Sequence, residues 1–245
     1  MTYGFVKQSL IRTNPAEAFG VFARNVSNSA TSGQRVINND SLYSGFRQLR
    51  KQLEIQQPGT FNNLAAAFIE SLVALKQDEL AGVLYSHLIK MNKDNLPLVK
   101  IYAQKALAIA KRNNDPVHRM ARADDICYVC AKTKPGSPEH IKYLYEQRTA
   151  LKDICAAYDT TLPDRFHTVS RELSDLSGYE LKLSALDMDL AIYIAYHDPK
   201  RAESLFDEAK NLFIKNKDCP DRNNLASVAK KIGNTYHKLA VYSKK

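Results

Sequence analysis

Apolar side chains recur at every third or fourth position through much of the chain, as at Leu42, Phe46, Leu49 and Leu53. An α-helix turns once in about 3.6 residues, so this spacing places such side chains on one helical face. Nine glycines and nine prolines punctuate the sequence, and Val, Ile and Thr do not cluster in the alternation that a sheet requires. The pattern therefore predicts an all-α protein.

The polar stretch 25–41 separates a first predicted helix, 15–24, from the remainder. Because it contains few bulky apolar side chains, we expect it to act as a flexible linker. The sequence thus predicts a loose N-terminal arm over residues 1–38, with a short helix and this linker, and a helical domain over residues 39–245. After two helices capped near Asp40 or Ser41 and at Thr60, we expect helices at 78–92, 96–113, 116–132, 138–158, 163–176, 179–197, 199–216 and 222–242.

Short connections of two to six residues between these helices are typical of antiparallel bundles and solenoids. Two junctions are alike: Asp115 precedes Pro116, and Asp198 precedes Pro199. In each, the aspartate can cap the free amides of a helix whose first-turn dihedral the proline sets. Recurring junctions suggest a repeated helical unit.

The segment 183–216 resembles a tetratricopeptide (TPR) repeat, and 96–116 resembles one more weakly. The first resemblance departs from the family pattern at Asp189, Leu190 and Ile214. A TPR-like array would pack two helices closely through small alanines, with aromatic rings in the wedge between them. A plain antiparallel bundle that uses alanine and aromatic residues for packing is the alternative. The matching positions are Leu186, Tyr193, Ala202, Phe206 and Ala209, with Ala106 and Leu107 in the weaker segment.

Two cysteines at C-x-x-C spacing, Cys127 and Cys130, raise the question of a metal or redox site. They fall near the end of a predicted helix, where the dipole disfavours a thiolate, and no second C-x-x-C accompanies them. Candidate further ligands are His140, Cys155 and His118, and none of them supplies a second paired motif. We interpret the cysteines as packed thiols, with Cys127, Cys130 and His140 as the metal candidates. Two D-x-x-H spacings, Asp115 to His118 and Asp164 to His167, we assign to capping and surface roles.

The net charge of +9 comes from 35 basic and 26 acidic residues, and it is spread unevenly. Residues 99–134 carry +5 and residues 135–197 carry −4, which suits a molecule with distinct faces. The basic side chains of the first segment include Lys100, Lys105, Lys111, Arg112, Arg119 and Arg122.

These features predict a non-catalytic adaptor or scaffold that binds a peptide or helix in a groove between helix pairs. Lys100, Lys105 and Arg119 are the predicted partner-binding residues, chosen for charge and predicted exposure. No cofactor is expected, and the cysteine usage predicts a cytoplasmic protein. The alternative is a helical protein that binds nucleic acid through the basic residues of 100–122 and the C-terminal helix.

Overall fold

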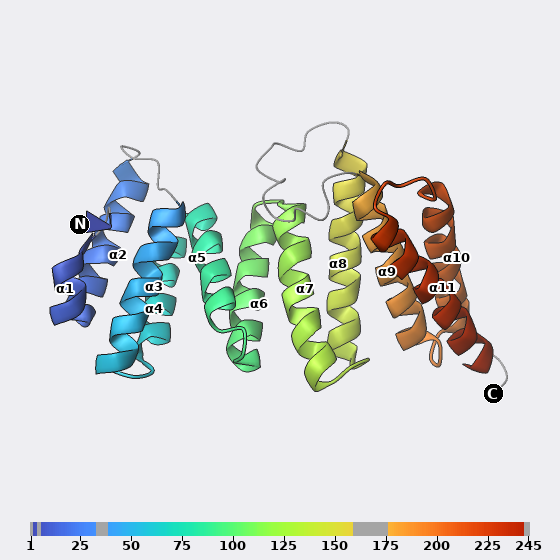
Figure 1. Ribbon diagram of the computed structural model, residues 1–245, viewed down its shortest axis with the longest axis horizontal. Helices are drawn as coiled ribbons and strands as arrows, with labels where there is room; N and C mark the ends of the chain where they lie inside the picture. The colour runs from blue at the N-terminus through green and yellow to red at the C-terminus, as the bar shows by residue number, and fades with distance from the viewer. Residues whose placement is uncertain (1, 4–5, 33–38, 159–175, 243–245) are drawn as a thin grey trace. The chain divides into compact units, whose positions relative to one another are not determined.

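The structure is a computed structural model that describes residues 2–3, 6–32, 39–158 and 176–242 (Figure 1). Two short strands, β1 (Thr2–Tyr3) and β2 (Val6–Lys7), pair antiparallel, and almost all else in the described ranges is helical. The all-α helical array is therefore confirmed. Its helices are α1 (Gln8–Thr13), α2 (Pro15–Ser32), α3 (Asn39–Gln56), α4 (Thr60–Ala74), α5 (Asp78–Met91), α6 (Leu96–Arg112), α7 (Pro116–Thr133), α8 (Pro138–Ala157), α9 (Leu176–Ile194), α10 (Pro199–Lys215) and α11 (Arg222–Tyr242).

The chain divides into two compact units, an N-terminal unit of residues 1–109 and a C-terminal unit of residues 110–245. Helix α6 begins in the first and ends in the second. Each unit is a set of packed helices with its own buried side chains. The boundary expected near residue 38 stays a prediction, although α2 packs against α3 across it.

The core of the N-terminal unit is built around a phenylalanine cluster. Phe19 and Phe22 of α2 meet Phe46 of α3, with ring centroids 6.0 and 5.7 Å from it. Phe61 and Phe68 of α4 close the cluster, and the Phe46 and Phe61 centroids are 5.3 Å apart in an edge-to-face arrangement. Such arrangements suit the quadrupoles of aromatic rings. The cluster holds three helices together.

Helix α2 is longer than the sequence indicated, because it runs to Ser32 rather than ending at Arg24. The apolar stripe of Phe19 and Phe22 continues one turn further to Val26, which is fully buried. The asparagines and serines after it lie on the remaining faces, so a polar composition concealed a helix. The predicted linker was therefore wrong at residues 25–32, which belong to α2, and at residues 39–41, which begin α3; residues 33–38 lie outside the described residues.

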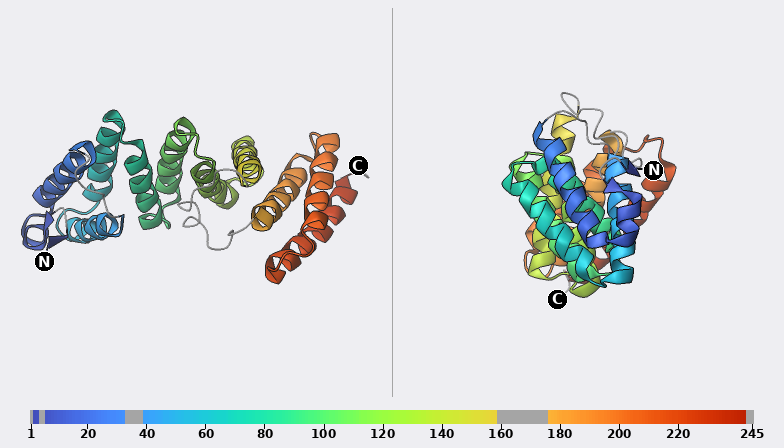
Figure 2. Two further views of the ribbon diagram at one scale, coloured as in Figure 1. Left: turned by 90° about the horizontal axis from the view of Figure 1, so that it is seen from above. Right: turned by 90° about the vertical axis from the view of Figure 1, so that its left-hand side faces the viewer.

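In the C-terminal unit, α7 packs against α8, and α9 packs against α8, α10 and α11. Helices α9 and α10 lie side by side along their length in both figures (Figures 1 and 2). Their approach is close: the Ser184 hydroxyl of α9 donates a 2.8 Å hydrogen bond to the backbone carbonyl of Ala209 in α10. Helix α9 is buried on nearly all sides, as expected for a helix with neighbours on several faces.

The predicted helices from 78 to 158 and from 199 to 242 agree with the structure to within about two residues. The caps predicted at Asp115 and Asp198 are confirmed, since each side chain accepts a hydrogen bond from the amide three residues on, and Ser137 caps α8 in the same way. Thr60 is not a cap: Gly59, with φ of 80°, occupies that position, and the Thr60 hydroxyl donates to the carbonyl of Gln57. The helix expected at 163–176 lies almost entirely outside the described residues.

No helix in the described ranges is both long enough and apolar enough to cross a membrane.

Candidate partner-binding surfaces

Two of the predicted partner-binding residues, Lys100 and Lys105, lie on α6. Five residues on a helix correspond to a rotation of about 140°, so the two side chains leave the helix on different faces. The Lys105 ammonium is exposed and pairs with the Glu70 carboxylate of α4 at 2.5 Å. Glu70 also accepts the hydroxyl of Tyr85, whose pKa is raised by burial and by this hydrogen bond. The structure therefore does not join Lys100 and Lys105 into one basic surface.

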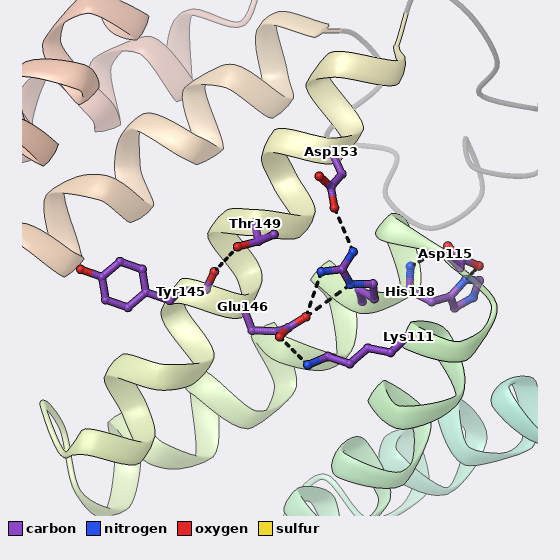
Figure 3. Close-up of polar contacts among 8 residues, drawn as sticks. Lys111, Asp115, His118, Tyr145, Glu146, Thr149 and Asp153 are labelled. Carbon is purple, nitrogen blue, oxygen red and sulfur yellow. Dashed lines mark hydrogen bonds and ion pairs between the residues drawn. The ribbon is translucent and has the colours of Figure 1, made fainter.

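The third predicted residue, Arg119 of α7, pairs with charged side chains of α8, and its partners Glu146 and Asp153 are labelled in Figure 3. Its guanidinium donates to Glu146 at 3.2 Å and to Asp153 at 2.9 Å, both on α8. Lys111 reaches the other oxygen of Glu146. Two cations and two carboxylates thus balance across the helices. Only 19% of the Arg119 side chain is exposed, which suits a connection between α7 and α8 better than a free anchor for a partner.

Asp115 and His118 form a pair at the start of α7, at one side of the same view (Figure 3). One carboxylate oxygen of Asp115 accepts the backbone amide of His118, and the other lies 2.6 Å from the ring Nδ1 of His118. The carboxylate thus caps the helix and orients the imidazole at once. The capping role predicted for Asp115 is confirmed. Asp164 and His167 lie outside the described residues.

Cys127 and Cys130 are both buried near the end of α7. Burial raises the pKa of the Cys127 thiol, so it is a packed neutral group rather than a ready thiolate. His140 lies in the joint between α7 and α8, where its Nδ1 accepts the amide of Gly136 at 3.1 Å. Its ring packs edge-to-face on Tyr193, with centroids 5.0 Å apart. Across the part of the chain that the structure describes, no group of three His, Cys, Asp or Glu side chains is placed to hold a metal ion.

Two of the aromatic residues that carry the TPR resemblance, Tyr193 and Phe206, contact residues outside the α9–α10 pair. The Tyr193 ring contacts His140, and a Cβ added at Gly136 would lie 3.0 Å from its Cδ1, so it packs against the turn before α8. Phe206 of α10 contacts Tyr236 of α11, with centroids 6.4 Å apart. The small Ala202 of α10 is buried. The rings thus contact further helices as well as the α9–α10 pair.

A buried ion network links α8, α9 and α10. Arg148 of α8 donates to Asp187 of α9 at 2.6 Å and also pairs with Glu208 of α10. The Asp187 side chain is fully buried, whereas Asp189, two residues on, pairs with Lys231 of α11 in a half-exposed position. Burial raises the pKa of Asp187, and its hydrogen bond from Arg148 offsets that effect only in part. The network holds α8, α9 and α10 together, and Arg148, Asp187 and Glu208 are all paired within it.

His87 of α5 has both ring nitrogens buried without a hydrogen-bond partner. Its ring packs on Tyr43 of α3, with centroids 4.7 Å apart. Burial and then the nearby Lys90 lower its pKa from 6.5 to about 4. The imidazole is thus held neutral at physiological pH.

This predicts a pH-dependent stability. As pH falls from about 6.5 towards 4, the unfolded chain binds a proton at this histidine before the folded chain does, so the free energy of unfolding decreases. We expect the contribution to be about 1 kcal/mol after allowance for solvent screening. Denaturant titrations of the wild type and His87→Phe at pH 7.5 and 5 measure it. The wild type should lose more stability than the variant, and equal losses would contradict the assignment.

A hollow of about 610 Å³ follows α3 in the N-terminal unit, and its described lining comes entirely from that helix. Three cations line it: Arg47 and Lys51 are exposed, and the half-buried Arg50 donates to the backbone carbonyl of Met91. Among the described residues, no carboxylate pairs with any of these three side chains. Glu54 stands at one end of the hollow. The three cations of α3 differ in this respect from Lys105, Lys111 and Arg119, each of which pairs with a carboxylate.

The sequence contained a signal for this surface. The same helix carries the apolar stripe at Leu42, Phe46, Leu49 and Leu53, and the basic side chains occupy the positions between. It is a weaker signal than the one at 100–122, because α3 contributes three cations and residues 100–122 contribute six. What the sequence alone did not show is which of the basic side chains have acidic neighbours from other helices.

No family model, no curated protein and no solved structure matches this chain.

Proposed function

We propose that this chain is a non-catalytic protein-interaction adaptor, and that a peptide of its partner binds along α3. The observation that carries the proposal is the hollow with three cations that have no acidic partner within the described residues. A cation beside a surface hollow that has no carboxylate partner can bind an acidic group of an incoming chain without breaking an existing ion pair. The helix holds these side chains in defined positions, which favours specific binding of one partner segment.

The pairing of helices supports a repeat-like scaffold. An ion pair joins Glu70 of α4 to Lys105 of α6, and another joins Lys111 of α6 to Glu146 of α8. Each spans 35 residues, close to the period of about 34 residues of TPR units. Contacts between every second helix are what stacked helix pairs make. We therefore keep the TPR-like interpretation as part of the proposal, with a cytoplasmic location that four free cysteines support.

The predicted contacts of Lys100, Lys105 and Arg119 with a partner remain proposals. A partner that used Lys105 or Arg119 would have to replace Glu70, Glu146 or Asp153 in existing ion pairs. The same exchange would be needed before Lys111 or Arg119 contacted phosphates, which weakens the nucleic-acid alternative at residues 100–122.

The test is affinity capture with the full-length chain after nuclease treatment, followed by reconstitution of each recovered partner from purified proteins. We expect a discrete protein that rebinds the purified chain. Repeated recovery of no rebinding protein would overturn the adaptor proposal. Tight binding of a fluorescent oligonucleotide at low salt, lost steeply as salt is raised, would support nucleic acid instead.

A further inference from the structure

We infer that the ligand of the α3 hollow is a short, extended acidic segment with a basic residue at one end; this rests on the adaptor function proposed above. The charges along the helix carry the inference. Arg47, Arg50 and Lys51 follow one another within about one turn, and Glu54 comes roughly one turn later. The hollow is therefore positive through its middle and negative at the end near Glu54.

The length of the hollow sets the length of the segment. Its lining runs from Tyr43 to Glu54, a span of about 16 Å at 1.5 Å per helical residue. An extended chain advances about 3.3 Å per residue, so about five residues cover this span. A carboxylate in the middle of such a segment can accept paired hydrogen bonds from the Arg47 guanidinium, while Arg50 keeps its bond to the Met91 carbonyl and adds positive charge. A lysine or arginine at the segment's end can pair with Glu54.

Tyr43 supplies a ring at the opposite end of the hollow from Glu54. One side of this ring packs against His87, which holds it in place. The aliphatic stem or apolar side chain of a bound residue can rest against the hollow-lining part of the ring. The hollow thus distinguishes its two ends, which gives a bound segment a preferred orientation.

A peptide fits this surface better than a nucleic acid. A phosphate backbone carries a charge at every nucleotide, so Glu54 would repel it at one end of the hollow. Single-stranded binding also relies on a series of aromatic rings for base stacking, whereas Tyr43 is the one aromatic residue among the described lining residues. The observations therefore favour an acidic peptide.

The test uses fluorescence polarisation with the full-length chain and labelled peptides of about five residues, acidic except for a lysine at one end. We expect Arg47→Glu combined with Lys51→Glu to weaken binding by about tenfold or more, because two attractive charges become repulsive. The matched control is Arg24→Glu combined with Lys76→Glu, which reverses two exposed cations of the same unit that are not among the described lining residues of the hollow. Its affinity should stay within about twofold of the wild type. Circular dichroism confirms that each variant is folded.

Glu54→Lys tests the polarity of the site. We expect it to remove the preference for a terminal lysine, so that an entirely acidic peptide of the same length binds more tightly than the lysine-ended one. Equal effects of the α3 double variant and the control double variant, or no binding of any acidic peptide to the wild type, would overturn the inference. So would an oligonucleotide that binds more tightly than the peptides and is lost in the α3 double variant.

The two proposals fail separately. If affinity capture yields a protein that rebinds the chain and the α3 double variant binds it equally well, the adaptor function stands and the acidic-segment inference is wrong. If the peptides bind but no partner protein is recovered, the ligand chemistry stands and the adaptor function is wrong.

Discussion

Arg148→Met is expected to lower the free energy of unfolding of the C-terminal unit by about 3–5 kcal/mol. The change removes the guanidinium that donates to Asp187 and leaves that fully buried carboxylate without its hydrogen-bonding partner. Water cannot replace the lost bonds at a side chain with no exposed surface. The remaining acid, Glu208, keeps Lys152 at 3.2 Å. The loss therefore comes mainly from Asp187, and denaturant titration monitored by circular dichroism measures it.

The pH dependence of this loss identifies its cause. Burial already raises the pKa of Asp187, and removal of Arg148 takes away the hydrogen bond that opposes that rise. A carboxyl with a raised folded-state pKa destabilises the protein above its unfolded pKa, and the penalty fades as pH falls and the group is protonated. The difference between Arg148→Met and the wild type should therefore be smaller at pH 5 than at pH 8. A difference that grows at lower pH would contradict this explanation.

Two further variants separate charge burial from packing. Lys231→Met breaks the Lys231–Asp189 pair, whose side chains are 32% and 40% exposed, and should cost no more than about 1 kcal/mol. Arg148→Met with Asp187→Leu removes both buried charges, and it should recover much of the stability that the single variant loses. If the double variant is no more stable than Arg148→Met, the loss reflects packing and not an uncompensated charge.

The sequence predicted helices more readily than the contacts between them. Apolar spacing and the Asp-Pro junctions depend on neighbours along the chain, so the helices that begin at Pro116 and Pro199 could be located from local pattern alone. The exception was α2, where asparagine and serine after Arg24 masked a stripe that continues to Val26. Tertiary packing of one apolar side chain on each turn outweighed the polar composition.

The candidate site depended on charges that approach from distant parts of the sequence. Arg119 looked like a free cation because Glu146 and Asp153 lie 27 and 34 residues away. The sequence does not reveal the role of Arg148, because its partners lie 39 and 60 residues away. A single sequence gives the type of each side chain but not its neighbours across helices. Arg47 and Lys51 of α3 differ from Lys105, Lys111 and Arg119 only through such neighbours, because carboxylates of other helices pair with the latter three.

The phenylalanine cluster beneath that face supplies the second large effect. Phe46→Ala is expected to lower the free energy of unfolding of the N-terminal unit by about 3–5 kcal/mol. Phe46 is fully buried and its ring lies within 6.0 Å of Phe19, 5.7 Å of Phe22 and 5.3 Å of Phe61, so its removal leaves a cavity among three helices. Helices α2 and α3 are already in close contact beside Phe46, since a Cβ added at Gly45 would lie 2.8 Å from Cε2 of Phe22. They therefore have little room to move together and fill the cavity.

Ile55→Ala is the control on the same helix, because Ile55 is 67% exposed and its truncation should cost less than about 0.5 kcal/mol. Amide hydrogen exchange assigns each effect to a unit: Phe46→Ala should speed exchange within α2, α3 and α4 and leave α8, α9 and α10 unchanged. Because Phe46 is adjacent to Arg47, the loss of its ring should also loosen the helix that presents the cations. Peptide affinity should therefore fall in Phe46→Ala but not in Ile55→Ala, and a fall of equal size in both would show that the hollow does not depend on this cluster.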